Sequence, residues 1–302
     1  ATIRDLPSLL SFVVNVAGTQ EFYYTGPAAS YNTNIRLNLQ SNVVGTTNLY
    51  ANQTTGALVI NGNVDKIGAG TSNSILLLAG SSTADNAING TITNTVGSLG
   101  ITKSGTGKWI LGADNTYDGD TKLAAGTLEI QNSNALRRSA VNLATGDTGI
   151  LTFKNITSAS FGSIYGTRNL ALTNSAGQDL TKLTIGFDNQ NQTYSGVLSG
   201  STTNLVINGL GTHTLTGINL YKGDTTINYG GITVSADSGI GNNPTASLIL
   251  NDGTFTNNST AFTTNRKIYL SGSTNAINGN IHITSQLINF NSDFNHTTGE
   301  LI

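Results

Sequence analysis

Two carboxylates, Asp118 and Asp120, stand one residue apart in a segment that could hold a cation. Hard oxygen ligands of this kind bind Ca²⁺. A related segment further along the chain has Lys222 where the first carboxylate stands and keeps only Asp224. Since a lysine cannot replace a metal ligand, we interpret both segments as turns in which the surviving carboxylate bonds to its own backbone. The sequence therefore predicts no metal site and no cofactor.

Two other short motifs match known binding sequences only in part. The tripeptide Lys222-Gly223-Asp224 resembles those through which some proteins bind integrins, but it lies in the predicted turn. Residues 103–109 (KSGTGKW) look like a phosphate-binding loop. That pattern requires a glycine five residues before the Gly-Lys pair and a serine or threonine after it, and those positions hold Thr102 and Trp109.

The residues needed for nucleophilic catalysis are scarce. The chain has no cysteine, no G-x-S-x-G motif and three histidines, His213, His282 and His296. His213 replaces a tryptophan of a related segment, and His282 lies between two apolar residues, so it faces solvent if they face inward. Neither has an acidic neighbour in the sequence, and we interpret both as ordinary strand residues. The sequence predicts no catalytic residue and no enzyme.

Acidic residues from separate strands are the remaining candidates for chemistry. Enzymes that cleave polysaccharides use carboxylates gathered on one face as general acid and base or as Ca²⁺ ligands. The sixteen Asp and Glu residues are scattered along the chain. Their convergence remains an open alternative, and it would involve Asp114, Asp118 and Asp120 with Asp188 or Asp224.

Composition sets the class of protein. Of 302 residues only 10% are charged, 36 are glycine and 3 proline, and Asn, Thr and Ser fill most polar positions. These residues disfavour helices and suit short strands joined by turns. A net charge of −2 without a basic stripe argues against nucleic acid as a partner, and no apolar run is long enough for a transmembrane helix. The segment 9–17 is expected to be a buried first strand or an end cap, not a signal peptide.

An internal repeat organises these strands. Residues 101–130 return as 205–234 without a gap. The shared positions are mostly turn residues, and each copy is expected to contain short strands separated by turns rich in Gly, Asn and Asp. The residues kept are Gly105, Gly107, Leu111, Asn115, Tyr117, Gly119, Asp120, Thr121 and Gly126, which return as Gly209, Gly211, Leu215, Asn219, Tyr221, Gly223, Asp224, Thr225 and Gly230.

This repeat resembles the autotransporter-associated β-strand repeat, also called the passenger-associated transport repeat. The family pattern runs G-x-G-x-L-x-L-x-G-x-N-T-Y-x-G-x-T-x-x-x-x-G-x-L. The first copy departs from it at Ile110 and Gly112, and the second lacks the Thr before Tyr221. The resemblance implies a right-handed parallel β-helix. It also fits the absence of cysteine, because such passengers cross the outer membrane largely unfolded.

The predicted fold is all-β, a right-handed parallel β-helix (β-solenoid) of short strands. A repeat of about 104 residues accommodates several coils of 20 to 25 residues, although a β-sandwich remains an alternative. Trp109, Leu111 and Leu215 are expected to point into the core, and Lys108 to face solvent. Some Asn side chains should stack on the Asn of the next coil.

Two regions are expected along the chain. Residues 1–70, the most aromatic part, should form an N-terminal cap or irregular first coils. Residues 71–302 should form the solenoid, with repeat units at 101–130 and 205–234. The last predicted strands, 281–283 and 287–290, keep core alternation before a polar run, so we expect the final coil to be covered by further coils of a longer chain or by another copy head to tail.

These observations favour a non-enzymatic protein of the bacterial cell surface or extracellular medium. Its solenoid would present a polar surface for adhesion or assembly, with a host or bacterial surface glycan or protein as partner. The alternatives are a filament or coat protein that assembles end to end, and a glycan-binding or glycan-cleaving β-helix such as a phage tailspike.

Overall fold

The computed structural model describes residues 9–14, 18–24, 28–31, 34–39, 45–52, 56–68, 73–259, 262–279, 281–283, 288–290 and 295–298. These residues form strands β1 to β33 and a short 3₁₀ helix, η1 (Asp237–Ile240), and they contain no α-helix. No helix in the described part is long and apolar enough to cross a membrane.

Contacts divide the chain into two compact units. Unit 1 comprises Ala1–Asn142 and Gly146–Ile156, and unit 2 comprises Leu143–Thr145 and Thr157–Ile302. Each unit contains one copy of the repeat, because residues 101–130 lie in unit 1 and residues 205–234 in unit 2. The predicted division near residue 70 into a cap and a solenoid stays a prediction.

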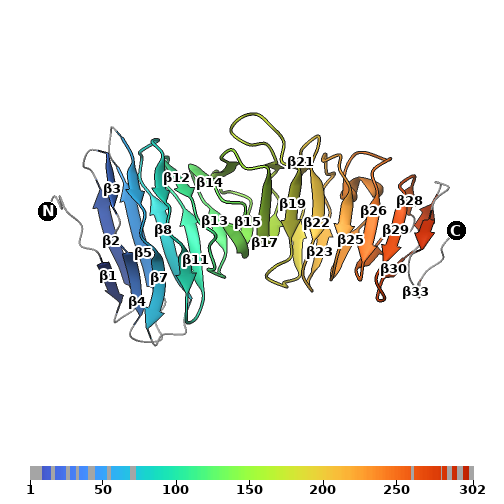
Figure 1. The fold of residues 1–302 in the computed structure, drawn as a ribbon, viewed down its shortest axis with the longest axis horizontal. Helices are drawn as coiled ribbons and strands as arrows, with labels where there is room; N and C mark the ends of the chain where they lie inside the picture. The colour runs from blue at the N-terminus through green and yellow to red at the C-terminus, as the bar shows by residue number, and fades with distance from the viewer. Residues whose placement is uncertain are drawn as a thin grey trace. The chain divides into compact units, whose positions relative to one another are not determined.

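Unit 1 has three parallel sheets, which the chain visits in turn (Figure 1). The first contains β1 (Leu9–Val14), β4 (Asn34–Leu39), β7 (Val64–Gly68) and β10 (Ile92–Asn94). The second contains β2 (Gly18–Tyr24), β5 (Gly45–Ala51), β8 (Ser74–Ala79), β11 (Leu99–Lys103), β13 (Thr121–Leu123) and β15 (Leu136–Leu143). The third contains β3 (Ala29–Tyr31), β6 (Leu58–Ile60), β9 (Asn86–Ile88), β12 (Lys108–Leu111), β14 (Thr127–Ile130) and β16 (Ile150–Phe153).

The coils of unit 1 become shorter at the repeat. In the second sheet Gly45 pairs with Ser74, 29 residues on, whereas Ile101 pairs with Thr121, 20 residues on. The difference arises because the strand of the first sheet is absent from the repeat, where the segment 112–120 connects β12 to β13. The predicted coil length of 20 to 25 residues therefore holds for the repeat, and the coils that precede it are longer.

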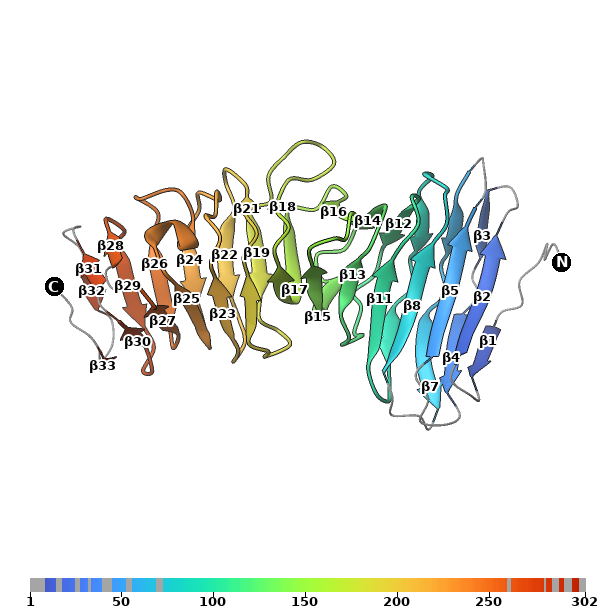
Figure 2. The ribbon, with the colours of Figure 1, turned by 180° about the vertical axis from the view of Figure 1, so that it is seen from behind.

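Unit 2 is built in the same way (Figure 2). One sheet contains β17 (Ser158–Gly166), β19 (Lys182–Ile185), β22 (Asn204–Ile207), β24 (Thr225–Ile227), β26 (Leu248–Asn251), β29 (Ile268–Ser271) and β32 (Ile288–Phe290). A second contains β20 (Gln192–Tyr194), β23 (Thr212–Leu215), β25 (Gly231–Val234), β27 (Thr254–Asn257), β30 (Ala276–Asn278) and β33 (Asn295–Thr298). The third side holds two short pairs, β18 (Leu170–Ala171) with β21 (Leu198–Ser199) and β28 (Phe262–Thr264) with β31 (Ile281–Ile283).

Strand pairing establishes the architecture. Within each unit the described strands pair in parallel with a strand of the coil before or after, as in β22 with β19 and β24. A sandwich joined by hairpins would need antiparallel pairs, and the described part has an antiparallel contact only as an isolated bridge between Thr173 and Asp179. The predicted all-β parallel solenoid is thus confirmed, while its right-handed sense stays a prediction. The expectation that the final coil is covered by further coils or by another copy concerns the segment beyond residue 290. That segment includes residues outside the described ranges.

Alternation along strands such as β8 and β11 places the core inside the coils, while β9, β12 and β14 are buried on both faces. In β8, Leu76 and Leu78 are fully buried, while Ile75 on the opposite face of the strand is 37% exposed. The predicted inward residues Trp109, Leu111 and Leu215 are each at most 1% exposed. Burial of side chains of this size stabilises by roughly 2 to 3 kcal/mol each.

Candidate binding surfaces

The asparagines shared by the two repeats are buried bridges and not turn residues. Asn115 accepts a hydrogen bond from the Ile92 amide at 2.8 Å and donates to the Ala135 carbonyl at 3.0 Å. Asn219 does the same with Leu198 and Gly239, at 2.9 and 2.7 Å. Each therefore joins the preceding and the following coil through backbone groups that would otherwise be buried without partners.

The shared tyrosines are also inside the coil. Tyr117 and Tyr221 are each 1% exposed, and their hydroxyls contact Thr121 at 2.7 Å and Thr225 at 2.8 Å. Burial raises the pKa of both phenols, so both remain neutral. The sequence interpretation of this stretch as a turn was therefore wrong for its Asn and Tyr, while Thr121 and Thr225 begin the strand that was expected after it. The polar atoms of the Asn and Tyr fill a side of the coil that has no strand.

The shared glycines allow the corners of neighbouring coils to stack closely. Gly126 has φ +69°, and a Cβ there would lie 2.4 Å from the Gly105 carbonyl oxygen. Gly230, with φ +62°, would meet the Gly209 carbonyl at 2.3 Å. Backbone atoms that close exclude any side chain, which explains why glycine occurs at these positions in both copies.

Asparagine stacking between coils is confirmed at an exposed position in unit 1 and at half-buried positions in unit 2. Asn89 donates to Asn61 at 2.9 Å in unit 1. In unit 2, Asn228 donates to Asn208 at 3.3 Å and receives a hydrogen bond from Asn251 at 3.1 Å. These amides link three successive coils in a row, which is the arrangement expected of Asn ladders.

Lys108 differs from its prediction. Its side chain is 23% exposed and forms ion pairs with Asp85 at 2.9 Å and Glu129 at 3.1 Å. Lys154 adds a contact with Asp85 at 2.7 Å. These four charges come from adjacent coils, so the lysine is partly covered by its partners and does not project into solvent. The two lysines in turn lower the pKa of Asp85.

The lysine of the phosphate-loop-like segment is structural. Lys103 is fully buried, and its Nζ donates to the carbonyls of Ser104, Gly105 and Ala125 at 2.5 to 3.1 Å. Burial lowers its pKa to about 8. An amine held by two carbonyls of its own corner and one of the following coil is not directed at a ligand, in agreement with the sequence analysis.

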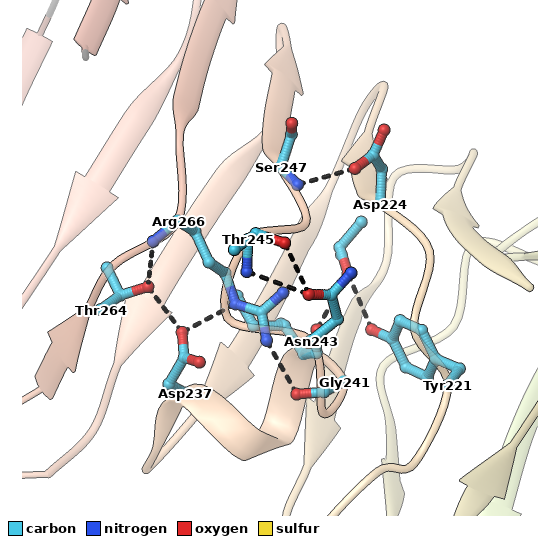
Figure 3. A network of polar contacts seen from close by, with 11 residues as sticks. Tyr221, Asp224, Asp237, Gly241, Asn243, Thr245, Ser247, Thr264 and Arg266 are labelled. Carbon is cyan, nitrogen blue, oxygen red and sulfur yellow. Dashed lines mark hydrogen bonds and ion pairs between the residues drawn. The ribbon is translucent and has the colours of Figure 1, made fainter. Parts of the chain in front are cut away.

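The carboxylates first considered as cation ligands differ in their surroundings. Asp118 and Asp120 are both exposed. Asp224 accepts a hydrogen bond from the Ser247 amide at 2.7 Å, which joins one coil to the next (Figure 3). The expectation that Asp224 bonds to its own backbone was therefore wrong, because the amide that it accepts from belongs to the following coil. Lys222 is exposed beside it.

The alternative of converging acids finds no support in the described residues. Asp114 accepts a hydrogen bond from Asn134 at 3.0 Å, and Asp188 accepts one from Ser163 at 2.5 Å and one from the Gln190 amide at 3.0 Å. The described part of the chain has no group of three or more His, Cys, Asp or Glu that could hold a metal ion.

His213 is the one histidine whose side chain the structure describes. It lies on β23, is 1% exposed, and neither ring nitrogen has a hydrogen-bond partner among the residues that the structure describes. Burial lowers its pKa to about 4, and the charge of Asp188 opposes this shift. Asp188 is thus an acidic neighbour of His213 that comes from an adjacent coil and not from the local sequence. The side chains of His282 and His296 lie outside the described residues.

The buried guanidinium of Arg266 forms hydrogen bonds at both ends of the 3₁₀ helix η1 in unit 2 (Figure 3). Arg266 is 1% exposed, and its Nε donates to Asp237 Oδ1 at 2.8 Å while Nη2 donates to the Gly241 carbonyl at 2.8 Å. Thr264 donates to the same carboxylate oxygen at 2.6 Å. These contacts tie both ends of η1 to the connection between β28 and β29. The sequence analysis did not single out Arg266, since nothing in the local sequence indicates its partner.

The second repeat exposes large apolar side chains that the first does not have. They are Leu210 (75% exposed), Ile218 (64%), Leu220 (43%) and Tyr229 (52%). The corresponding residues of the first repeat are Thr106, Asp114, Thr116 and Ala125. Because the same backbone accepts polar or small residues there, the fold itself does not require these apolar groups.

An aromatic pair made of the exposed Tyr23 and the half-buried Tyr50 lies on β2 and β5 of unit 1. The rings of Tyr23 and Tyr50 are stacked with centroids 4.2 Å apart and planes inclined by 3°. Glu21 accepts hydrogen bonds from both hydroxyls and from Asn48. The high aromatic content of residues 1–70 was the sequence signal for this site, although we interpreted it as a cap.

Comparison with known proteins places the repeat in a family. The passenger-associated-transport-repeat pattern matches residues 101–130 and 205–236, which confirms the resemblance seen in the sequence. Over 141 residues the chain is 38% identical to the adhesin BmaC autotransporter of Brucella suis biovar 1 (strain 1330). The match covers 45% of this chain and 4% of that protein, so the chain spans a small part of this relative's length. No solved structure matches the chain.

Proposed function

We propose that this chain is part of an autotransporter passenger that acts in adhesion at the bacterial surface or in the extracellular medium, without catalysing a reaction. The observation that carries the proposal is the 38% identity with an autotransporter adhesin, together with two passenger-associated transport repeats. Adhesion needs a stable surface repeated along a scaffold, and stacked parallel coils supply such a surface.

The arrangement of polar groups supports a binding role over a hydrolytic one. Asp114, Asp188 and Asp224 each accept hydrogen bonds from neighbouring residues, as expected of structural carboxylates. A hydrolytic pair would need two carboxyl groups that face one another across a substrate. The polar amides and hydroxyls at the corners of the coils offer contacts for a ligand instead.

The test compares bacteria that carry the intact protein with bacteria that carry an in-frame deletion of this segment. We expect surface-applied protease to cleave the protein on intact cells, and the deletion to reduce adhesion to host cells or matrix. The purified chain should release no reducing ends from bacterial or host polysaccharides. Release of reducing ends that a single Asp→Asn change abolishes would favour the tailspike-like alternative.

A further inference from the structure

The outward face of β2, β5 and β8 carries a cluster of side chains that we call the tyrosine platform. Its exposed members are Glu21, Tyr23 and Ile75, its half-buried members are Tyr50 and Leu77, and Asn48 between them is buried at 6% exposed. They alternate with core residues such as Tyr24, Leu49 and Leu76, which are at most 8% exposed. The platform therefore lies on the solvent side of a sheet whose other side is packed.

Strand register orders the platform in two rows, and Ile75, which pairs with Thr46, lies outside both. Glu21, Asn48 and Leu77 lie opposite one another on successive strands. Tyr23 and Tyr50 form the second row, which continues with Ala79, a buried residue. Neighbouring strands are spaced by about 4.8 Å, so the rows form a flat surface with a regular repeat and a step after Tyr50.

The tyrosines offer an accessible aromatic surface. Tyr23 is 54% exposed although it is stacked on Tyr50. Stacking covers one face of each ring and fixes both in parallel planes. A ligand with an apolar flat side can pack on an aromatic ring held in this way with little loss of side-chain entropy.

The polar members hold the tyrosines in place. Glu21 Oε2 accepts a hydrogen bond from the Tyr23 hydroxyl at 3.2 Å, and Oε1 accepts bonds from Asn48 at 3.2 Å and Tyr50 at 3.4 Å. Asn48 Nδ2 also contacts the Tyr50 hydroxyl at 3.3 Å. The site is thus preorganised on rigid strands, with about one lone-pair site of the Glu21 carboxylate left, on Oε2, to accept a hydroxyl group.

We propose that the tyrosine platform binds a neutral oligosaccharide chain. A sugar ring presents a C–H face that packs on an aromatic ring such as that of Tyr23, and a hydroxyl that bonds to the exposed carboxylate of Glu21. Glu21 is the only charged member, so uronic or sialic acids would be repelled. Three internal donors already stabilise its charge, which weakens its attraction for a cationic ligand. This inference rests on the proposed adhesive function and specifies its ligand.

The experiment measures binding of the purified full chain to neutral hexose oligosaccharides of four to six units, to oligomers that contain uronic acid, and to oligolysine. We expect binding to the neutral sugars alone. Tyr23→Ala and Tyr50→Ala should each weaken it at least tenfold. Glu21→Gln, which preserves the shape of the carboxylate, should weaken it several-fold and leave the thermal midpoint nearly unchanged.

Tyr229→Ala is the matched control, because Tyr229 is 52% exposed and alanine is the residue of the first repeat at that position. It should leave sugar binding unchanged. Tyr23→Phe keeps the ring and should retain most of the affinity, which separates stacking from a general loss of structure. Equal binding by Tyr23→Ala and the parent chain, salt-sensitive binding of oligolysine alone, or no sugar binding would overturn the proposal. Adhesion that persists on cells carrying Tyr23→Ala would overturn the platform's role and leave the adhesive function intact.

Discussion

At the scale of single residues, identical positions in the two repeats hold side chains with different chemistry. Trp109 and His213 both lie at most 1% exposed on corresponding strands. The tryptophan donates its indole N–H to the Ala79 carbonyl at 2.9 Å, whereas neither ring nitrogen of the histidine has a partner. The core therefore accepts a polar ring at this place only in its neutral form.

We expect His213 to make the stability of the protein depend on pH. Its pKa is about 4 in the folded chain and 6.5 in an unfolded chain, so below pH 6.5 the unfolded chain binds a proton that the folded chain does not. The contribution of neutral His213 to the free energy of unfolding is fully present above pH 6.5. It is lost as the pH falls toward 4, which lowers the free energy of unfolding by on the order of 3 kcal/mol. Urea unfolding between pH 7 and pH 4.5 measures this loss.

His213→Leu is the control for this prediction. Asp179 and Asp252 also have lowered pKa values because they accept hydrogen bonds, but they titrate mainly below this range. Most of the decrease between pH 7 and pH 4.5 should therefore disappear in the variant. An unchanged pH dependence in His213→Leu would show that other groups cause it.

At the scale of elements, the coil is closed by buried polar bridges where a strand is missing. Asn115 and Asn219 each satisfy one backbone amide and one carbonyl on different coils. The η1 turn is fastened in a comparable way by Arg266. Local sequence signals for these roles are weak, because an Asn in a Gly-rich segment suggests an exposed turn.

Asn219→Leu should destabilise unit 2 strongly. The substitution leaves the Leu198 amide and the Gly239 carbonyl buried without partners, each at a cost of about 1 to 3 kcal/mol. The same change at Asn228, which lies half-buried in the row formed with Asn208 and Asn251, should cost about 1 kcal/mol, since water can replace its amide. Denaturant midpoints of the two variants provide the comparison. Equal losses would mean that Asn219 does not bridge the coils.

At the scale of the whole molecule, stability should be distributed over neighbouring coils. In a solenoid each coil contacts only those before and after it, so a local defect spreads over a limited distance. Leu215 and Leu210 belong to the same repeat and differ in exposure, at 1% and 75%. They allow this property to be tested with one kind of substitution.

Leu215→Asp should bury an unpaired charge and destabilise by several kcal/mol, with faster hydrogen exchange in β20, β23 and β25. Leu210→Asp should change stability by less than about 0.5 kcal/mol, because its side chain is already in solvent. Hydrogen exchange followed by mass spectrometry locates the change along the chain. Slow exchange retained in β23 of Leu215→Asp would contradict the inward assignment.

The sequence alone determined the fold class, the repeat and the residues of its core. Alternation fixes which side of a strand is apolar, so Leu111 and Leu215 were assigned inward correctly, and the kept glycines marked the corners. The tertiary structure decided which coil supplies each partner. Lys108 is covered by Asp85 and Glu129, Asp224 bonds to Ser247, and Asp188 lies near His213. These pairs join residues about 20 or more positions apart, and only the stacking of coils sets that register.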